Sequence, residues 1–170
     1  MRKYFMKTNR VGFSNWKETD FNLAALLWSN PEVTKYISSG GFSEVQIKNR
    51  FETELKNMEL YNIQYYPLFD IQTEEFIGCS GLKPFNINEN TYETGFHLLP
   101  SYWGKGIATE VGEAVINYAF NVIKADTIYT GHNPNNIGSK RVIEKLGFQY
   151  IKDTFYEPTG LYHPLYKITK

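Results

Sequence analysis

The residues best suited to chemistry in this sequence lie in two short stretches in the second half of the chain. The first is a glycine-rich segment, Trp103–Ala108, which follows an apolar run and opens a helical pattern. Glycines at a helix start leave backbone N–H groups uncovered, and the positive end of the helix dipole attracts phosphate. The segment predicts an anion site built from backbone amides, although glycines there also serve plain tight turns.

The second stretch is a polar cluster at the exit of a predicted strand. It contains helix-capping asparagines, a serine in the first helical turn and a glycine that ends the helix: Asn133, Asn135, Asn136, Ser139 and Gly147. A well-capped surface helix explains the caps and the glycine without any function. It does not explain the whole polar cluster, one strand away from the glycine-rich segment, so the cluster is a second candidate binding segment.

Two titratable side chains share one face of the strand that precedes the glycine-rich segment. Glu93 and His97 are four residues apart in the predicted strand 92–99, and side chains at even spacing point to the same side of a strand. A carboxylate or an imidazole there can take a proton from an amine. Because Glu93 can also be a buried partner that holds two strands together, and His97 a packed residue, the identity of the base stays open.

The elements that position these residues follow from hydrophobic spacing. Aromatic and β-branched runs predict strands at 63–71 and 75–82, and further strands are expected at 10–13, 92–99, 126–130, 148–155 and 161–168. Apolar residues three or four positions apart predict helices at 20–30, 43–58, 107–122 and 136–146. This order is typical of an α+β domain with a mixed sheet. No linker or repeat divides the chain, so we expect residues 1–170 to form one domain.

Composition narrows the class of protein. Lysine plus arginine and aspartate plus glutamate each number 18, and a net charge of zero argues against a nucleic-acid binder. No window approaches the length of a membrane span, and the amino terminus lacks the apolar core of a signal peptide. The single cysteine, Cys79, excludes an internal disulfide and suits a reducing compartment. We therefore expect a cytoplasmic protein without a metal, a membrane partner or a nucleic-acid partner.

The two stretches together resemble the signature motifs of the GNAT superfamily of N-acetyltransferases. The coenzyme A loop of that family runs Gln/Arg-x-x-Gly-x-Gly/Ala; this sequence matches it at Gly106 and Ala108 and departs from it at Trp103. Asn136-x-x-Ser139, followed by the run 144–148 (Glu-Lys-Leu-Gly-Phe), resembles the second motif. The order and spacing of the two motifs carry the resemblance.

Further patterns are similar to one branch of the superfamily, named for ribosomal-protein N-terminal acetyltransferases. These are Trp103 in the loop with Glu110 two residues beyond Ala108, and the amino-terminal pattern 10–13 (Arg-Val-Gly-Phe), Asp20 and 28–33 (Trp-Ser-Asn-Pro-Glu-Val). The resemblance thus spans nearly the whole chain.

The resemblance implies a GNAT fold: a mixed, mostly antiparallel, twisted sheet of six to seven strands, with two N-terminal helices and two helices in the C-terminal half. It implies acetyl-CoA as the cofactor, with its pyrophosphate on the loop amides and its pantetheine arm bonded to an exposed strand as a pseudo-strand. Trp103 then either covers the loop or packs in the core. The residues implied at the cofactor are His97, Leu98, Leu99, Trp103, Gly104, Lys105, Gly106, Ile107, Ala108, Thr109, Asn136, Ser139 and Lys140.

The implied reaction is transfer of an acetyl group from acetyl-CoA to a primary amine by direct attack on the thioester. A backbone N–H near Leu98 is the expected oxyanion donor, and Glu93 or His97 is the expected base. Ser139 is expected to protonate the leaving thiolate, with Tyr162 and His163 of the last strand as alternatives. The acceptor, either a protein N-terminus or a small molecule, and the oligomeric state, a homodimer included, stay open.

Two other classes of protein share parts of the pattern. Gly104-x-Gly106 opens a helix and Asp126 follows about twenty residues on, as in the dinucleotide fingerprint of an oxidoreductase. Against that class, Thr109 replaces the third glycine and Asp126 precedes its strand. A non-catalytic acyl-CoA-binding regulatory module would keep the loop and transfer nothing to an amine.

Overall fold

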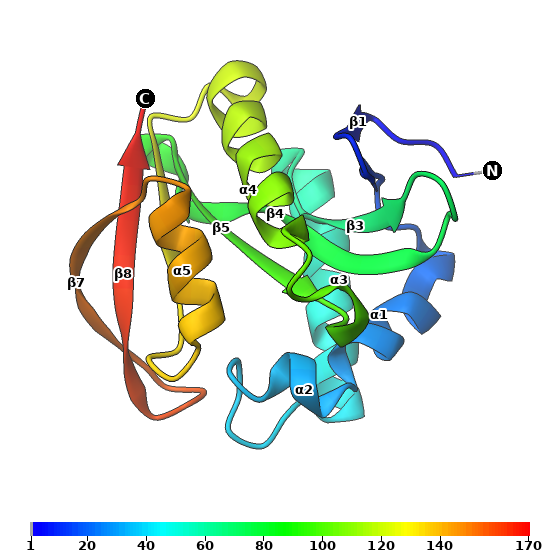
Figure 1. The fold of residues 1–170 in the computed structure, drawn as a ribbon, viewed down its shortest axis with the longest axis horizontal. Helices are drawn as coiled ribbons and strands as arrows, with labels where there is room; N and C mark the ends of the chain where they lie inside the picture. Colours follow the sequence, from blue (N-terminus) through cyan, green and yellow to red (C-terminus); the bar gives the residue numbers. More distant parts are fainter. Residues whose placement is uncertain (1) are drawn as a thin grey trace.

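A computed structural model describes residues 2–170, whose strands form an eight-stranded sheet with helices packed on both faces (Figure 1). The strand order is β1-β2-β3-β4-β5-β6-β8-β7. The strands are β1 (Met6–Lys7), β2 (Val11–Phe13), β3 (Tyr65–Asp70), β4 (Phe76–Asn86), β5 (Thr91–Leu98), β6 (Thr127–Gly131), β7 (Gln149–Tyr156) and β8 (Leu161–Thr169). All neighbours are antiparallel except β5 and β6. This sheet is not the doubly wound parallel sheet that the dinucleotide-binding alternative requires.

The α-helices are α1 (Phe21–Trp28), α2 (Pro31–Thr34), α3 (Glu44–Tyr61), α4 (Ile107–Tyr118) and α5 (Ile137–Lys145). Short turns of 3-10 helix occupy Glu18–Asp20, Ile87–Glu89 and Pro100–Tyr102, and a π-helical turn, Ala119–Ile123, extends α4. Local sequence sets the α3 ends. Ser43 and Gln46 exchange side-chain and backbone hydrogen bonds as a capping box, and Asn62 ends the helix in the left-handed conformation.

The sequence expectations differ from the structure at two elements. The sheet has eight strands rather than six to seven, because β1 contributes two residues that pair only with β2 and are too few to show alternation. In addition, a short helix that was not predicted, α2, follows the helix expected at 20–30: Pro31 opens it at its first position, and the Asn30 side chain accepts from Glu32 N–H (3.0 Å). Proline is favoured there because the first helical N–H has no intrahelical partner.

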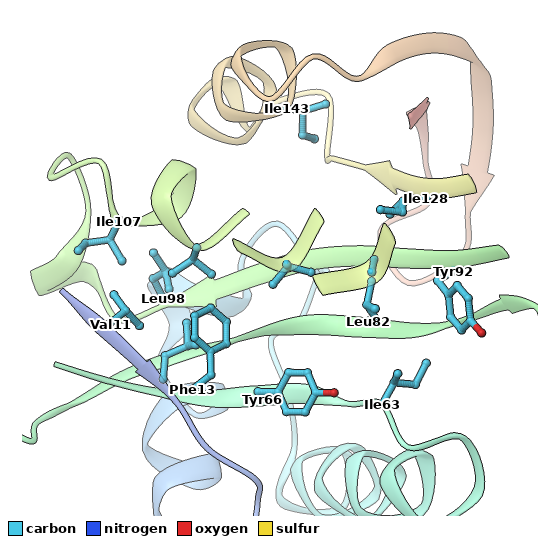
Figure 2. Close-up of a cluster of buried hydrophobic side chains, with 14 of the residues drawn as sticks. Val11, Phe13, Ile63, Tyr66, Leu82, Tyr92, Leu98, Ile107, Ile128 and Ile143 are labelled. Atoms are coloured by element: carbon cyan, nitrogen blue, oxygen red, sulfur yellow. The ribbon is translucent and has the colours of Figure 1, made fainter. Parts of the chain in front are cut away.

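Two hydrophobic clusters hold the layers together. One packs α4 and α5 on the sheet face that carries Leu82 and Leu98. Figure 2 shows part of it, with Leu98 on the sheet, Ile107 at the start of α4 and Ile143 on α5. The other packs α1 and α3 on the opposite face around Trp28. No helix in the described range 2–170 is both long enough and apolar enough to cross a membrane.

Candidate active site

The middle of the sheet opens where β5 separates from β6. The two strands pair in register only from Thr91 to Glu93, opposite Thr127 to Tyr129. Beyond that point β5 continues to Leu98, and its β6 side has no further strand partner in the described chain. A pseudo-strand ligand requires such an open strand edge.

The free backbone groups on this edge belong to Phe96 and Leu98. On the other side β5 pairs with β4, and Leu99 N–H donates to Ile77 C=O (2.9 Å). Hydrogen-bonded pairs alternate along an antiparallel ladder, so Phe96 and Leu98 point toward the gap. Thr130 Oγ1 bonds to Thr94 C=O (2.9 Å) on the same side. Of the expected residues His97, Leu98 and Leu99, only Leu98 therefore has its backbone groups directed into the gap. Phe96, which was not expected, has them directed there as well.

Trp103 closes over the end of β5. Its Nε1 donates to Leu98 C=O (2.8 Å), and the residue is 43% exposed, so it is not a core side chain. Of the two expectations, the covering position fits the structure. With its carbonyl taken by the indole, Leu98 keeps its N–H for a ligand in the gap.

The loop before α4 has the geometry of an anion cradle. Gly104 (φ +70°) and Gly106 (φ +74°) adopt the left-handed conformation, and no heavy atom lies within 4 Å of a Cβ built on Gly104. No side chain caps α4, so the N–H groups of Ile107, Ala108 and Thr109 lack intrahelical partners. Within residues 2–170, the N–H groups of 104–106 donate no backbone hydrogen bond. These donors fit a pyrophosphate.

Arg10, just before β2, holds this loop in place. Its Nη1 donates to Lys105 C=O (2.8 Å), and its Nε donates to Glu110 Oε2 (2.7 Å) in the first turn of α4. Thr8 Oγ1 and the Arg10 backbone N–H donate to the other Glu110 oxygen. These bonds and the Arg10 charge lower the pKa of Glu110 below its ordinary value, against the effect of burial. The carboxylate near the cradle is thus neutralised by Arg10.

Two adjoining cavities flank the open edge of β5. The first, about 270 Å³, is bounded by the α4 loop, the start of α5 and the α2 segment. The second, about 410 Å³, is bounded by β4 to β8 and by α3. Six residues line both cavities: Tyr36, Ile37, Phe96, His97, Asn136 and Ser139. A ligand in the first cavity and one in the second would meet at these shared walls.

Asn136 and Ser139 stand at this junction. The Asn136 side chain caps α5 by accepting from Ser139 N–H (3.1 Å). In the part of the chain that the structure describes, the Ser139 hydroxyl has no hydrogen-bond partner, so its proton is available to a ligand. Asn136 therefore has a structural role in addition to lining the site.

Glu93 lines the second cavity and also links two strands. Its Oε1 lies 3.1 Å from Lys83 Nζ, on the residue opposite it in the β4–β5 ladder, and its side chain is 31% exposed. The carboxylate is therefore open to the cavity and not a buried partner. Glu93 can therefore link the strands through Lys83 and still present its carboxylate to a ligand in the cavity.

His97 is held by the indole of Trp28. Trp28 Nε1 donates to His97 Nδ1 (3.0 Å), so Nδ1 carries no proton and the neutral ring has its proton on Nε2. Burial, and then the charges of Arg50 and Lys83, lower the pKa of His97 well below its ordinary value. Its one free nitrogen is a hydrogen-bond donor, which suits positioning better than proton abstraction.

Tyr162 and Lys140 lie outside both cavities. Side chains alternate along β8, so His163 lines the second cavity while Tyr162 points away, is 64% exposed and packs against Phe155. The expectation that Tyr162 enters the cleft is therefore corrected. Lys140 lies on the outer face of α5, 3.9 Å from Glu144.

The sequence did not point to the charged layer beneath His97. Arg50 lines the second cavity, pairs with buried Glu54 (2.8 Å) and lies over the ring of Tyr65. The Tyr65 hydroxyl would lie 2.7 Å from a Cβ on Gly95, which explains that glycine. Burial and the Glu93 carboxylate raise the pKa of Tyr65. Arg50 and Glu54 are four residues apart, a spacing typical of an ion pair on a helix, but this spacing does not reveal that the pair lies under a site.

Comparisons with known proteins agree with this geometry. Residues 10–149 match the family model described as the acetyltransferase (GNAT) domain. An uncharacterized N-acetyltransferase of Bacillus licheniformis is 27% identical over 84% of this chain and 80% of its own length. Protein YkkB of Bacillus subtilis is 30% identical over 85% of both chains.

Solved structures show the same fold. A GNAT-family acetyltransferase of Bacillus anthracis superposes with a TM-score of 0.81 at 26% identity, over 96% of this chain and 97% of that one. Spermidine N-acetyltransferase of Vibrio cholerae, solved with CoA and spermine, has a TM-score of 0.80 at 17% identity, over 95% and 96%. Ribosomal-protein-S5-alanine acetyltransferase of Vibrio fischeri has a TM-score of 0.79 at 17% identity, over 96% and 95%. The chain belongs to the GNAT family and is an acetyl-CoA-dependent N-acetyltransferase.

Proposed function

We propose that the enzyme acetylates a primary amine that enters through the second cavity and meets the thioester at the walls shared by the two cavities. The observation that carries this proposal is the position of the Leu98 N–H, which faces the gap between β5 and β6 in the first cavity, next in the chain to Phe96 and His97, which line both cavities. When bound, acetyl-CoA supplies the thioester carbonyl. The loop amides 104–109 would hold its pyrophosphate, and the Phe96 backbone its extended arm.

We assign three steps to residues of this chain. Glu93 takes the proton of the amine, directly or through water. Leu98 N–H stabilises the negative charge that develops on the carbonyl oxygen, as a preorganised donor that needs no rearrangement. As the amine nitrogen bonds to the carbonyl carbon and the C–S bond breaks, the Ser139 hydroxyl delivers a proton to the departing thiolate and takes one back from water. His97 donates from Nε2 and orients the acceptor, because its Nδ1 is occupied by Trp28.

We also propose that residues 1–170 form one GNAT domain of the branch named for ribosomal-protein N-terminal acetyltransferases. The loop residues Trp103 and Glu110 and the amino-terminal pattern that includes Arg10 support the branch, and Arg10 and Glu110 are in contact. The branch does not fix the acceptor. A protein N-terminus and a small amine both present the group that the proposed chemistry requires.

Substitution of the proposed base tests this assignment. We expect Glu93→Gln to lower kcat by about 10²- to 10⁴-fold, the range for loss of general base catalysis, and to leave the affinity for acetyl-CoA unchanged. Thiol release from acetyl-CoA in the presence of amines gives kcat, and calorimetric titration gives the affinity.

Glu89→Gln is the matched control, since Glu89 lies in an exposed 3-10 turn outside both cavities. Full activity of the Glu93→Gln enzyme with a lower melting temperature would contradict the assignment and leave Glu93 as a strand link to Lys83. If the unsubstituted protein binds acetyl-CoA but releases no thiol with any amine, the result would favour the non-catalytic acyl-CoA-binding module instead.

A further inference from the structure

The charged side chains that line the second cavity are mostly positive. They are Arg50, Lys83, Glu93 and Lys152. Two of the three cations already have carboxylate partners: Arg50 lies 2.8 Å from Glu54, and Lys83 lies 3.1 Å from Glu93. Among residues 2–170, Lys152 lies within ion-pair distance of no carboxylate. Once these pairs cancel, one positive charge remains in the wall.

This balance disfavours an acceptor with several positive charges. A polyamine binds best where carboxylates outnumber cations, because unpaired like charges repel in a partly desolvated site. Here the one carboxylate in the wall is engaged by Lys83, and Lys152 would face the far end of the acceptor. The imidazoles of His97 and His163 add no negative charge.

The positions of Glu93 and Lys152 also set a minimum length for an acceptor that contacts both side chains. Glu93 lies on β5 and Lys152 on β7, and β6 and β8 separate them in the sheet. Three strand spacings of about 4.8 Å place the backbones at least roughly 14 Å apart, because Lys152 is level with Gly131 and Glu93 with Tyr129. Both side chains line the cavity between them. A molecule that contacts both therefore has a spacer of several bonds between its ends.

We infer that the acceptor is an amine that carries an acidic group several bonds from the nitrogen, with the amine at Glu93 and the acid at Lys152. This inference rests on the proposed function and names the class of acceptor for the same site. Aromatic side chains of the wall, Phe85 and Tyr156, would pack along the spacer. Either a small amino acid or the N-terminus of an acidic peptide has this chemistry.

Three acceptors of similar length test the effect of charge at the end of the acceptor that is distant from the amine. These are 6-aminohexanoate, hexylamine and 1,6-diaminohexane, whose far ends are negative, neutral and positive. With saturating acetyl-CoA, we expect kcat/KM per free amine to fall in that order, with about fivefold between the first and the last. Lys152→Glu is expected to reverse the order. A peptide with an acidic second residue tests whether the acceptor is the N-terminus of an acidic peptide and not a small amino acid.

Lys167→Glu is the control for a general change of surface charge, because Lys167 lies on the adjacent strand β8 but does not line the cavity. It should leave the order unchanged. A preference for the diamine or spermidine, or an order that Lys152→Glu does not alter, overturns the inference while acetyl transfer stands. If no acceptor is turned over, calorimetric binding of the same three compounds decides: equal affinities overturn the inference, and absent acetyl-CoA binding overturns the proposed function.

Discussion

At the scale of single residues, the chemical role of a histidine depends on which of its nitrogens is free. The Trp28 indole donates to His97 Nδ1, and the ring also packs edge-on against Tyr65. These neighbours remove water from the imidazole and disfavour its charged form. The same contacts leave Nε2 as a donor toward the cavities. The packing that buries His97 therefore also restricts what it can do to a substrate.

We predict a pH-dependent stability that His97 controls. The folded-state pKa of His97 is lowered, so below about pH 6.5, its unfolded-state value, the unfolded chain binds the extra proton and stability is lost as the pH falls toward the folded-state pKa. Denaturant unfolding at pH 7.5 and 5.5 should show this loss, and His97→Gln should reduce it. Burial, and then His132, lower the pKa of His163 as well. His163→Gln is therefore the comparison variant, which measures how much of the loss comes from this second histidine. An unchanged loss in His97→Gln would contradict this account.

At the scale of elements, the cofactor loop depends on a segment almost one hundred residues away in the chain. Arg10 lies beside β2 and bonds both to the loop carbonyl of Lys105 and to Glu110 of α4. The amino-terminal hairpin is thus part of the cofactor site, although it forms none of its walls. Arg10 and Glu110 are both charged, so loss of their contact changes the electrostatic potential at the anion cradle as well as the shape of the loop.

We expect Arg10→Ala to weaken CoA binding by about tenfold, or roughly 1.4 kcal/mol, because an uncompensated Glu110 carboxylate would face the pyrophosphate. The double variant with Glu110→Gln should recover part of that loss. Calorimetric titration with CoA measures both. Arg2→Ala is the matched control, since the Arg2–Asp20 pair is also an arginine–carboxylate contact but does not touch the loop. Equal weakening in the single and double variants would mean that the Arg10 effect is not electrostatic.

The sequence predicts the long elements well and the short or irregular ones poorly. Runs of aromatic and β-branched residues identify strands such as β3 and β4, and the Ser43 capping box locates α3. The two residues of β1 are too few to show a periodic pattern. Pro31 is taken as the end of a helix, and not the start of one, unless the Asn30 cap is recognised. The glycine loop is visible because its conformation requires glycine. Trp28 beside His97 and Arg50 beneath it depend on tertiary packing, which no spacing reveals.

At the scale of the whole molecule, the sheet consists of two parts joined through the short β5–β6 pairing. Loops connect the parts again across the cavities: Ser39 N–H donates to Pro158 C=O (3.0 Å), and Asn133 Nδ2 donates to Tyr36 C=O (3.2 Å). A cofactor between the two parts would contact both of them. Its binding energy should therefore stabilise the entire fold and not one loop.

Thermal unfolding with and without acetyl-CoA measures that effect. A ligand at one hundred times its Kd adds about 2.7 kcal/mol, which for a chain of this size raises Tm by roughly 5–11 °C. NADH at the same concentration should give no shift, because the chain lacks the third glycine of the dinucleotide fingerprint. A shift with NADH and none with acetyl-CoA would contradict the cofactor assignment.

The open edge of β5 has a consequence for local stability. An amide in a paired strand is protected from exchange with deuterated solvent, whereas an unpaired one exchanges readily. The N–H groups of Phe96 and Leu98 should therefore exchange quickly in the free protein, although they lie in the middle strand of a sheet and next to a hydrophobic core. CoA should slow both, while Leu99, bonded to Ile77, stays protected throughout. In this enzyme the ligand would complete the secondary structure.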